Sequence, residues 1–381
     1  MYSQSDLMPW VEALHDDVPD LEVFDTHVHI GIKDPAGLEA IEEEVVEALD
    51  AVRSRAVIFP LADPDGYRAA NRRLIELANE RPHQLRALVR VDPADDPAGQ
   101  TRDGLDRGAV GVKLHPRGEG FRVADPRLDD VFALADERRL PVMVHAGVGD
   151  TSIGPEALQR ARRNPGARVI LAHCAIGSFE QVIHEIDDVP NVFFDTSWWN
   201  PADIWALFRM VPPSRILYAS DIPFTSPACA MITTGRLAIQ AGLSPHQVRA
   251  VMGGQLERLV THQDPLDVGP APEDVAYLPP ELERLYVTLL TAVEPMLRGA
   301  DPGQGLQLAQ AAAQSPVGPH AEVIECIASL LELNERKTDP DPLRPGRLPG
   351  FDLVQMAAVA ARTPDATSPS QSRIRQLTGV G

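Results

Sequence analysis

The chain has 381 residues, and 44% of them are hydrophobic, as in a globular protein with a full-sized core. Its formal net charge of −20 argues against a nucleic-acid partner, because phosphate binding requires clustered lysine and arginine side chains. The acidic N-terminus carries no apolar signal segment, and no apolar run approaches the roughly 20 residues of a membrane span, so we expect no membrane contact.

The cysteines indicate the compartment. Cys174, Cys229 and Cys326 are odd in number and lie far apart along the chain. This pattern fits a reducing environment without a disulfide framework, and it predicts a cytoplasmic protein.

The chain begins with a leader, residues 1–20, in which one short helix is expected near Met8–His15. From residue 21 onward, short β-rich runs recur at Leu21–Thr26, Arg55–Pro60, Leu85–Val91, Val110–Leu114, Pro141–His145, Arg168–Ala172, Asn191–Asp195 and Arg215–Ser220. Segments of helical character lie between them, for example at Leu38–Val52, Tyr67–Glu80, Arg127–Arg138 and Ile204–Met210. Strands that alternate with helices pair in parallel through right-handed crossovers.

Eight such units within about 240 residues favour an α/β fold, a closed (β/α)8 TIM barrel over residues 21–262, since this fold takes about 250 residues. The helical stretch Leu243–Val260 would close the eighth unit. A doubly wound open sheet is the alternative. It is disfavoured because no glycine-rich dinucleotide loop follows the first strand.

Residues 263–381 are expected to form a C-terminal extension. His262–Pro280 is rich in proline, aspartate and glycine and is typical of a linker. Helical spacing then predicts helices at Leu282–Leu297, Leu306–Ala313, Ala321–Leu333 and Phe351–Ala361, with a loop at Asp339–Pro349 and a disordered end at Thr363–Gly381. Three roles are open for the extension: a cover for the barrel, a lid over the site, or a surface that forms a homo-oligomer.

The stretch Phe24-Asp-Thr-His-Val-His29 follows the first apolar run. In a strand, Asp25, His27 and His29 point to the same face. Two neutral imidazoles with a carboxylate beside them make half of a metal site. Two hydrogen-bonded histidines near a strand end are the structural alternative, which the rest of the chain disfavours.

The active site of a TIM barrel lies at the C-terminal ends of the strands. Five of the eleven histidines fall at predicted strand ends, and further polar side chains join them there. These residues are His27, His29, Lys113, His115, His145, His173, Asp195 and Asp221. Imidazoles with a carboxylate form the open, water-bearing site of a hydrolytic metal. A loop hydrogen bond for His115, an ion pair for Lys113 and a loop cap for Asp195 are the structural alternatives.

The chain resembles the amidohydrolase superfamily, in its aminocarboxymuconate-semialdehyde decarboxylase-like group, over about residues 21–262. The motifs that carry the resemblance are Phe24-Asp-Thr-His-Val-His29, Gly111-Val-Lys-Leu-His-Pro116, Val144-His-Ala146, Leu171-Ala-His-Cys174, Phe194-Asp-Thr-Ser197 and Ala219-Ser-Asp-Ile-Pro223. Gln255 departs from the group's usual asparagine. The set is specific for a fold and a metal site, and much less so for a substrate.

The resemblance implies that His27, His29, His145 and Asp221 ligate a metal ion, for which zinc is the expected cation. It implies that His173 is the catalytic acid/base, and Asp221 could also take the proton of the attacking water. One ion is favoured over two. A second ion would require a carboxylated Lys113 as a bridge.

The expected function is hydrolysis of an amide, cyclic amide, lactone or similar bond in a small molecule. Lys113, His115, Arg117 and Trp198 are the candidate substrate-binding residues, with Trp199 as a further pocket wall. A non-oxidative decarboxylase with the same site is the second hypothesis, although no arginine clearly stands at the end of the second strand. A metal-bearing scaffold protein is the third. The net charge disfavours a metal-dependent nuclease.

Overall fold

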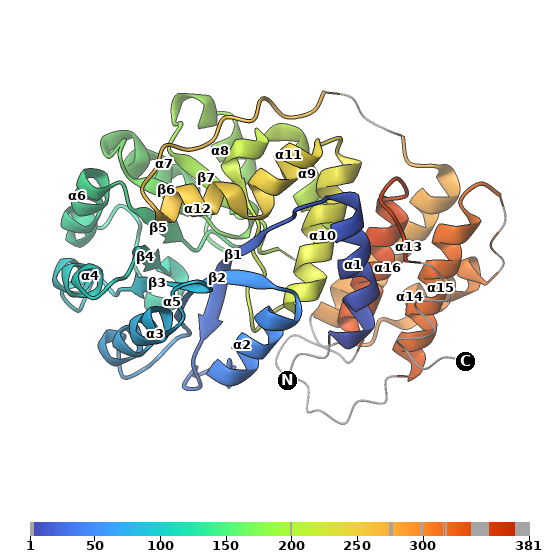
Figure 1. Cartoon of the computed structure of the whole chain (residues 1–381), viewed down its shortest axis with the longest axis horizontal. Coiled ribbons are helices and arrows are strands. Elements are labelled where there is room, and N and C mark those ends of the chain that lie inside the picture. Colours follow the sequence, from blue (N-terminus) through green and yellow to red (C-terminus); the bar gives the residue numbers. More distant parts are fainter. Residues whose placement is uncertain are drawn as a thin grey trace.

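The computed structural model describes most of the chain, with a barrel on one side and a group of helices beside it (Figure 1). The described residues are 4–198, 200–273, 277–297, 300–314, 316, 318–336 and 350–369.

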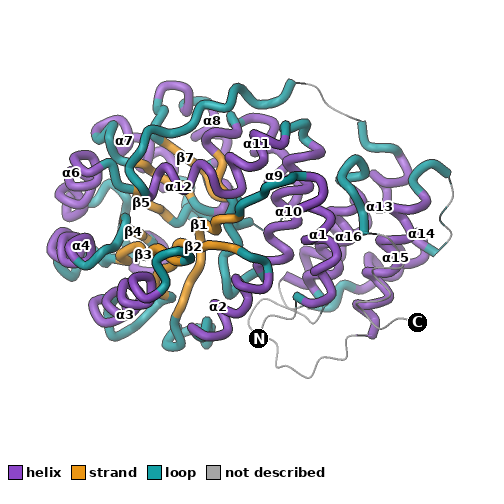
Figure 2. The backbone as a smooth tube through the Cα atoms, viewed as in Figure 1, coloured by secondary structure: helices purple, strands orange, loops and turns teal. Residues whose placement is uncertain are grey.

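The strands of the described residues form one eight-stranded parallel sheet, in which each strand pairs with the next along the chain (Figure 2). They are β1 (Val23–Ile30), β2 (Ser54–Pro60), β3 (Leu85–Arg90), β4 (Gly111–Leu114), β5 (Pro141–Val144), β6 (Arg168–Leu171), β7 (Val192–Asp195) and β8 (Ile216–Leu217). The barrel closes where Val28 of β1 forms a parallel bridge with Ile222. The predicted TIM barrel is therefore confirmed, and the open sheet is wrong.

Helices surround this barrel on the outside. They are α2 (Glu42–Ala51), α3 (Arg68–Glu80), α4 (Pro97–Asp106), α5 (Pro116–Glu119), α6 (Asp129–Arg138), α7 (Ile153–Arg163), α8 (Phe179–Ile183), α9 (Pro201–Met210), α10 (Pro227–Gln240), α11 (Pro245–Arg249) and α12 (Gln255–Val260). Among the described residues, none of the helices has both the length and the apolar character needed to cross a bilayer.

The helices named as examples from the sequence correspond to α2, α3, α6 and α9, and the bounds of α4, α5, α7, α8 and α10 were not given there. Helix α4 contains glycine because Gly104 packs directly on β3: a Cβ atom there would lie 2.2 Å from Cγ2 of Val89. Helix α10 is buried on nearly all sides, so its sequence lacks the polar face by which an amphipathic helix is recognised.

The interior of the barrel is filled by large apolar side chains such as Phe24, Phe59 and Phe193. Leu256 and Leu259 of α12 belong to the same cluster, so this helix packs onto the apolar interior of the barrel. The stretch predicted as one helix, residues 243–260, is divided into α11, a π-helical turn at Ala250–Gly254 and α12.

The leader is part of the packed structure. Its helix α1 (Met8–Asp17) buries Trp10 and Leu14 and lies against α10. A Cβ atom on Gly235 of α10 would lie 2.6 Å from Cδ2 of Leu14, so the glycine permits this close approach.

The C-terminal extension forms the helices beside the barrel in Figure 1. They are α13 (Pro280–Leu297), α14 (Gly303–Ala313), α15 (Ala321–Arg336) and α16 (Phe351–Arg362). Helix α16 packs against α13, α15 and α10, and so joins the extension to the barrel.

Part of the predicted disordered end is ordered. Arg236 of α10 donates from Nε to Thr363 Oγ1 at 2.9 Å and from Nη1 to the carbonyl oxygen of Thr367 at 2.6 Å, which fixes residues 363–367. A buried guanidinium requires such acceptors, and the chain supplies them. The predicted loop 339–349 and residues 370–381 lie outside the described residues.

Candidate metal centre

Strand β1 carries the first two histidines into the mouth of the barrel. A shift of the pairing register between Asp25 and Val28 marks a β-bulge, which changes the alternation of faces along the strand. The rings of His27 and His29 both contact the interior ring of Phe59, with centroid distances of 5.1 and 4.7 Å.

Three potential ligand atoms converge at this mouth. His27 Nε2 lies 3.2 Å from His29 Nε2, and Asp221 Oδ1 lies 3.2 and 3.3 Å from these two nitrogens. Ligands that each bind one ion at about 2.0–2.2 Å are separated by roughly 3.0–3.5 Å in octahedral or tetrahedral geometry. The spacing of these three side chains therefore fits a divalent metal ion. In the part of the chain that the structure describes, they form the one group of three or more potential ligands that lie close enough together to hold an ion.

Hydrogen bonds orient the two imidazoles for this task. His27 Nδ1 donates to Asp195 Oδ2 at 2.8 Å, so its Nε2 carries the lone pair. His29 Nδ1 faces the carbonyl oxygen of Pro60 at a longer 3.5 Å. A carboxylate behind a ligating histidine fixes its tautomer and raises its basicity.

The histidines of the site are held in their neutral form. Burial lowers the pKa of His27, His29 and His145 well below the usual value, and neighbouring cationic groups add to the shift. Burial also lowers the pKa of His173, although Asp195 opposes it. Neutral imidazoles are the form that binds a metal ion.

His145 and His173 lie beside the three converging residues and form a hydrogen-bonded pair. The carbonyl oxygen of Ser197 can only accept, so His173 Nδ1 donates to it at 2.7 Å. His173 Nε2 then accepts from His145 Nδ1 at 2.9 Å. His145 Nε2 consequently carries a buried lone pair with no hydrogen-bond partner among the described residues.

The backbone that presents these groups is strained. His173, Cys174 and Ala175 have φ values of 56°, 55° and 55°, and Asp221 has 62°. Left-handed conformations cost non-glycine residues about 1–2 kcal/mol each. Strain of this kind is concentrated at functional sites, where the surrounding structure holds it in place.

Comparison with known proteins agrees with this geometry. The profile of the Amidohydrolase family matches residues 24–255, which is more than half of the chain. The chain belongs to the amidohydrolase family. No curated protein sequence matches it.

Solved structures show the same fold as this amidohydrolase. An uncharacterised TIM-barrel protein from Bordetella bronchiseptica is 16% identical with a TM-score of 0.52, and the match covers 64% of this chain and 99% of that one. 5-Carboxyvanillate decarboxylase from Sphingomonas paucimobilis is 13% identical with a TM-score of 0.50, covering 64% and 99%. At these identities the likeness concerns the fold alone.

Asp25, which the strand pattern placed beside the two histidines, has a structural position in the amidohydrolase. Its Oδ1 accepts from the backbone nitrogens of His27 and Ser220, both at 3.0 Å. It thereby joins β1 to the segment after β8. Burial raises the pKa of Asp25 to about 7.

Lys113 of β4 is fully buried against the same centre. Its Nζ lies 3.1 Å from His27 Nε2 and 4.5 Å from the ring centroid of Phe59. Burial lowers the pKa of Lys113 to about 7, while Asp195 acts in the opposite direction. No ion pair joins Lys113 to Asp195 among the described residues, because Asp195 binds His27 and Ser197 instead.

The other predicted substrate-binding residues surround the mouth of the amidohydrolase. His115 stacks on His145 with ring centroids 4.0 Å apart, and its Nδ1 accepts from the backbone nitrogen of Gly118. Arg117 is exposed and donates to the carbonyl oxygen of Val148 at 3.3 Å. The ring centroid of Trp198 lies 6.4 Å from that of His173. The side chain of Trp199 lies outside the described residues.

Sequence reasoning missed a buried ion pair at the ends of β3 and β4. Arg90 donates from Nη2 to Glu119 Oε1 at 2.6 Å and from Nη1 to the carbonyl oxygen of Pro60 at 3.0 Å. Tyr67 donates to the same oxygen of Glu119. The position of Arg90 at the end of a predicted strand was the available signal. Because Glu119 neutralises it, this guanidinium is not a free cation for an anionic substrate.

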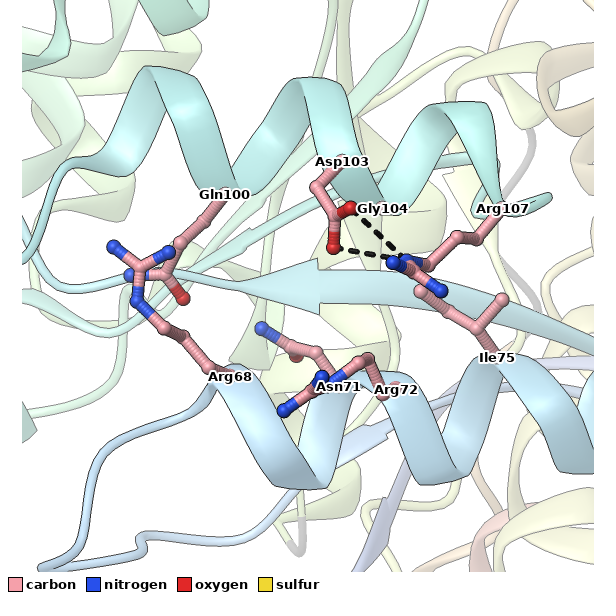
Figure 3. A pocket seen from close by; sticks show the side chains of 8 residues that line it. All are labelled: Arg68, Asn71, Arg72, Ile75, Gln100, Asp103, Gly104 and Arg107. Atoms are coloured by element: carbon pink, nitrogen blue, oxygen red, sulfur yellow. Dashed lines mark hydrogen bonds and ion pairs between the residues drawn. The ribbon is translucent and has the colours of Figure 1, made fainter.

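A groove of about 330 Å³ lies elsewhere, between α3 and α4 on the outside of the barrel (Figure 3). Arg68, Arg72 and Arg107 line it, but Arg107 Nε donates to both carboxylate oxygens of Asp103, and Arg68 pairs with Asp95 at 2.9 Å. These acids offset the arginines, and none of the three converging residues of the metal centre lines the groove. The metal centre is therefore the candidate active site of the amidohydrolase.

Proposed function

We propose that this amidohydrolase is a zinc-dependent hydrolase that cleaves an amide, cyclic amide, lactone or similar bond of a small molecule. The observation that carries the proposal is the triangle of His27, His29 and Asp221, whose ligand atoms lie 3.2–3.3 Å apart. Two imidazole nitrogens and one carboxylate oxygen are a donor set that suits zinc.

We propose His145 as the fourth ligand, because its Nε2 carries a buried lone pair without a partner among the described residues. When bound, the ion would lower the pKa of a water molecule from 15.7 to about 7 and polarise the scissile carbonyl group. The remaining catalytic and positioning roles are assigned to side chains of the protein.

In this proposal Asp221 accepts the proton of the attacking water at its second carboxylate oxygen. His173 is the general acid/base: its Nε2, which accepts from His145 Nδ1 in the structure, would exchange a proton with the leaving group once that bond is released. Asp195 holds His27 in the tautomer that presents Nε2, through a bond of 2.8 Å. Arg117 and Trp198 are proposed to contact the substrate at the rim, and His115 to support His145 by stacking.

A non-oxidative decarboxylase is the second candidate. Carbon–carboxylate cleavage requires a cation that holds the carboxylate, and Lys113 is the buried amine nearest to the centre. The decarboxylase from Sphingomonas paucimobilis has the same fold, so aromatic acids belong among the substrates to be tested.

One screen separates the candidates. Zinc-loaded protein is incubated with a panel of lactones, cyclic amides and aromatic acids, and product formation and carbon dioxide release are both measured. We expect ring-opening hydrolysis that stops when zinc is removed. Carbon dioxide release from an aromatic acid would instead establish the decarboxylase. A protein that binds zinc and converts no member of the panel would support the scaffold hypothesis. A cytoplasmic location and self-association through the extension stay predictions.

A further inference from the structure

Asp221 lies in the connection between β8 and α10, residues 218–226. The backbone nitrogen of Phe224 donates to the carbonyl oxygen of Asp221 at 2.7 Å, which folds the connection into a tight turn. At its other end, Ser226 caps α10, with its Oγ accepting from the backbone nitrogen of Cys229 at 3.3 Å. Helix α10 therefore begins six residues after Asp221, and its first turn fixes the end of the connection that carries the Asp221 carboxylate.

The two ends of the chain both bind this first turn. Ser226 Oγ donates to Asp352 Oδ2 of α16 at 2.7 Å. The backbone nitrogen of Ala228 donates to Gln4 Oε1 of the leader at 3.1 Å, and Gln4 Nε2 donates to the carbonyl oxygen of Ala48 at 2.7 Å. The first backbone N–H groups of a helix have no acceptor within the helix, so Gln4 supplies one. A carboxylate such as Asp352 is favoured near the positive end of the helix dipole.

Helix α16 approaches the same connection at a second point. Gln355 is 1% exposed and lines a cavity of about 10 Å³ together with Ser220, Thr225 and Thr233. Gln355 Oε1 and Thr233 Oγ1 have no hydrogen-bond partner among the described residues. A cavity of this size holds about one water molecule, and a water here would join α16 to α10 and to the segment that precedes Asp221.

We propose that Asp352 is a positioning residue of the metal centre: through Ser226 it fixes the first turn of α10 and thereby the Asp221 carboxylate. Gln4 holds the same turn from the leader side. The C-terminal extension is then neither a detached appendage nor a simple cover, but a part of the frame that sets the metal affinity of the barrel. This inference rests on the proposed role of Asp221 as a ligand.

The chain contains a matched control. Asp365, also in the extension, accepts from Gln240 Nε2 at 2.9 Å at the opposite end of α10. Asp352→Ala and Asp365→Ala each delete one carboxylate of the extension that is bonded to the same helix. The two variants release opposite ends of α10. Comparing their zinc affinities therefore separates an effect on the metal centre from the loss of stability that both variants share.

The measurement is zinc affinity by competition with a chromogenic chelator, together with thermal unfolding of the metal-free proteins. We expect Asp352→Ala to weaken zinc binding by at most about 10- to 150-fold, the range that one lost hydrogen bond to a charged group gives when all of it reaches the ligand. We expect Asp365→Ala to bind zinc like the wild type at a comparable loss of thermal stability. Adding Asp352→Ala to Ser226→Ala should weaken zinc binding no further than Ser226→Ala alone, because Asp352 acts only through its bond to Ser226.

Equal zinc affinities for Asp352→Ala and Asp365→Ala would overturn the inference and leave the extension as a stabilising cover. If Asp352→Ala does not fold, Asp352→Asn preserves the shape and removes the charge, and it should show a smaller weakening in the same direction. A wild-type protein that binds no divalent ion would instead refute the proposed function, so the two failures are distinguishable.

Discussion

Nζ of Lys113 lies 3.1 Å from Nε2 of His27, the same nitrogen that faces His29 and Asp221. An amine at that distance competes with a metal ion for the lone pair, and in its charged form it also repels the ion. The number of ions in the site therefore depends on what state Lys113 adopts.

We expect one zinc ion per chain and an unmodified lysine. On that basis Lys113→Met should bind zinc at least as tightly as the wild type, because the substitution removes a competing donor and a positive charge. Metal content per chain and electron density beyond Nζ decide the matter. Two ions joined by a carboxylated lysine in the wild type, with loss of one ion in Lys113→Met, would contradict the single-ion proposal.

The role of His173 predicts a separation of binding from catalysis. As the acid/base, His173→Asn should keep most of its zinc, while turnover falls by about 10²–10⁴ because proton transfer to the leaving group is lost. Zinc content measured beside kinetics on the same preparation tests this. Complete loss of zinc in His173→Asn would place this histidine among the ligands.

The ligand set predicts a graded loss of metal. His29→Ala removes a corner of the triangle and should weaken zinc binding more than His145→Ala does. His145 lies outside the group of converging atoms, so three ligands remain in place without it. Titration of zinc into both variants gives the comparison, and the reverse order of affinities would make His145 the more important ligand.

The buried histidines predict acid sensitivity of the metal-free protein. Burial lowers the pKa of His27, His29, His145 and His173, and that of His115 to about 2. As the pH falls below about 6.5, the unfolded chain takes up protons that the folded chain does not, so the free energy of unfolding decreases. Each histidine contributes up to about 1.4 kcal/mol per pH unit.

Denaturant unfolding of the zinc-free protein at pH 8, 6.5 and 5.5 tests this pH dependence. We expect little change from 8 to 6.5, apart from the opposite-signed contributions of Asp25 and Lys113, and a clear decrease from 6.5 to 5.5. His115→Phe, which keeps a ring stacked on His145, should reduce the decrease. A stability that does not change below pH 6.5 would show that the histidines titrate normally in the folded state.

The strand ends of the site could be predicted from the sequence, because a barrel brings one end of every strand to a common mouth. Position placed His27, His29 and Asp221 among the candidates there, and the family resemblance singled them out as ligands. The partner of Asp195 did not: a carboxylate at a strand end can bond a histidine, a lysine or a loop, and only packing selects His27. The β-bulge beyond Asp25 likewise left no mark in the alternation of residue types.

The role of the extension was beyond sequence reasoning for a different reason. The bond between Ser226 and Asp352 joins residues far apart in the chain, and neither belongs to a motif. Helix α10 was not delimited from the sequence: it is surrounded by α1, α9 and α16, so it has no polar face to reveal a helical period.

Arg236 has a consequence for the order in which the protein is made. Its guanidinium is buried within α10, yet the oxygens that accept its hydrogen bonds belong to Thr363, Ala366 and Thr367. During synthesis the barrel strands emerge well before these acceptors, so a ribosome-bound barrel holds an unsatisfied cation on one side and exposes the apolar surface that α16 later covers. We therefore expect the last helices to dock late in folding, and a nascent chain released early to expose this surface to chaperones and proteases.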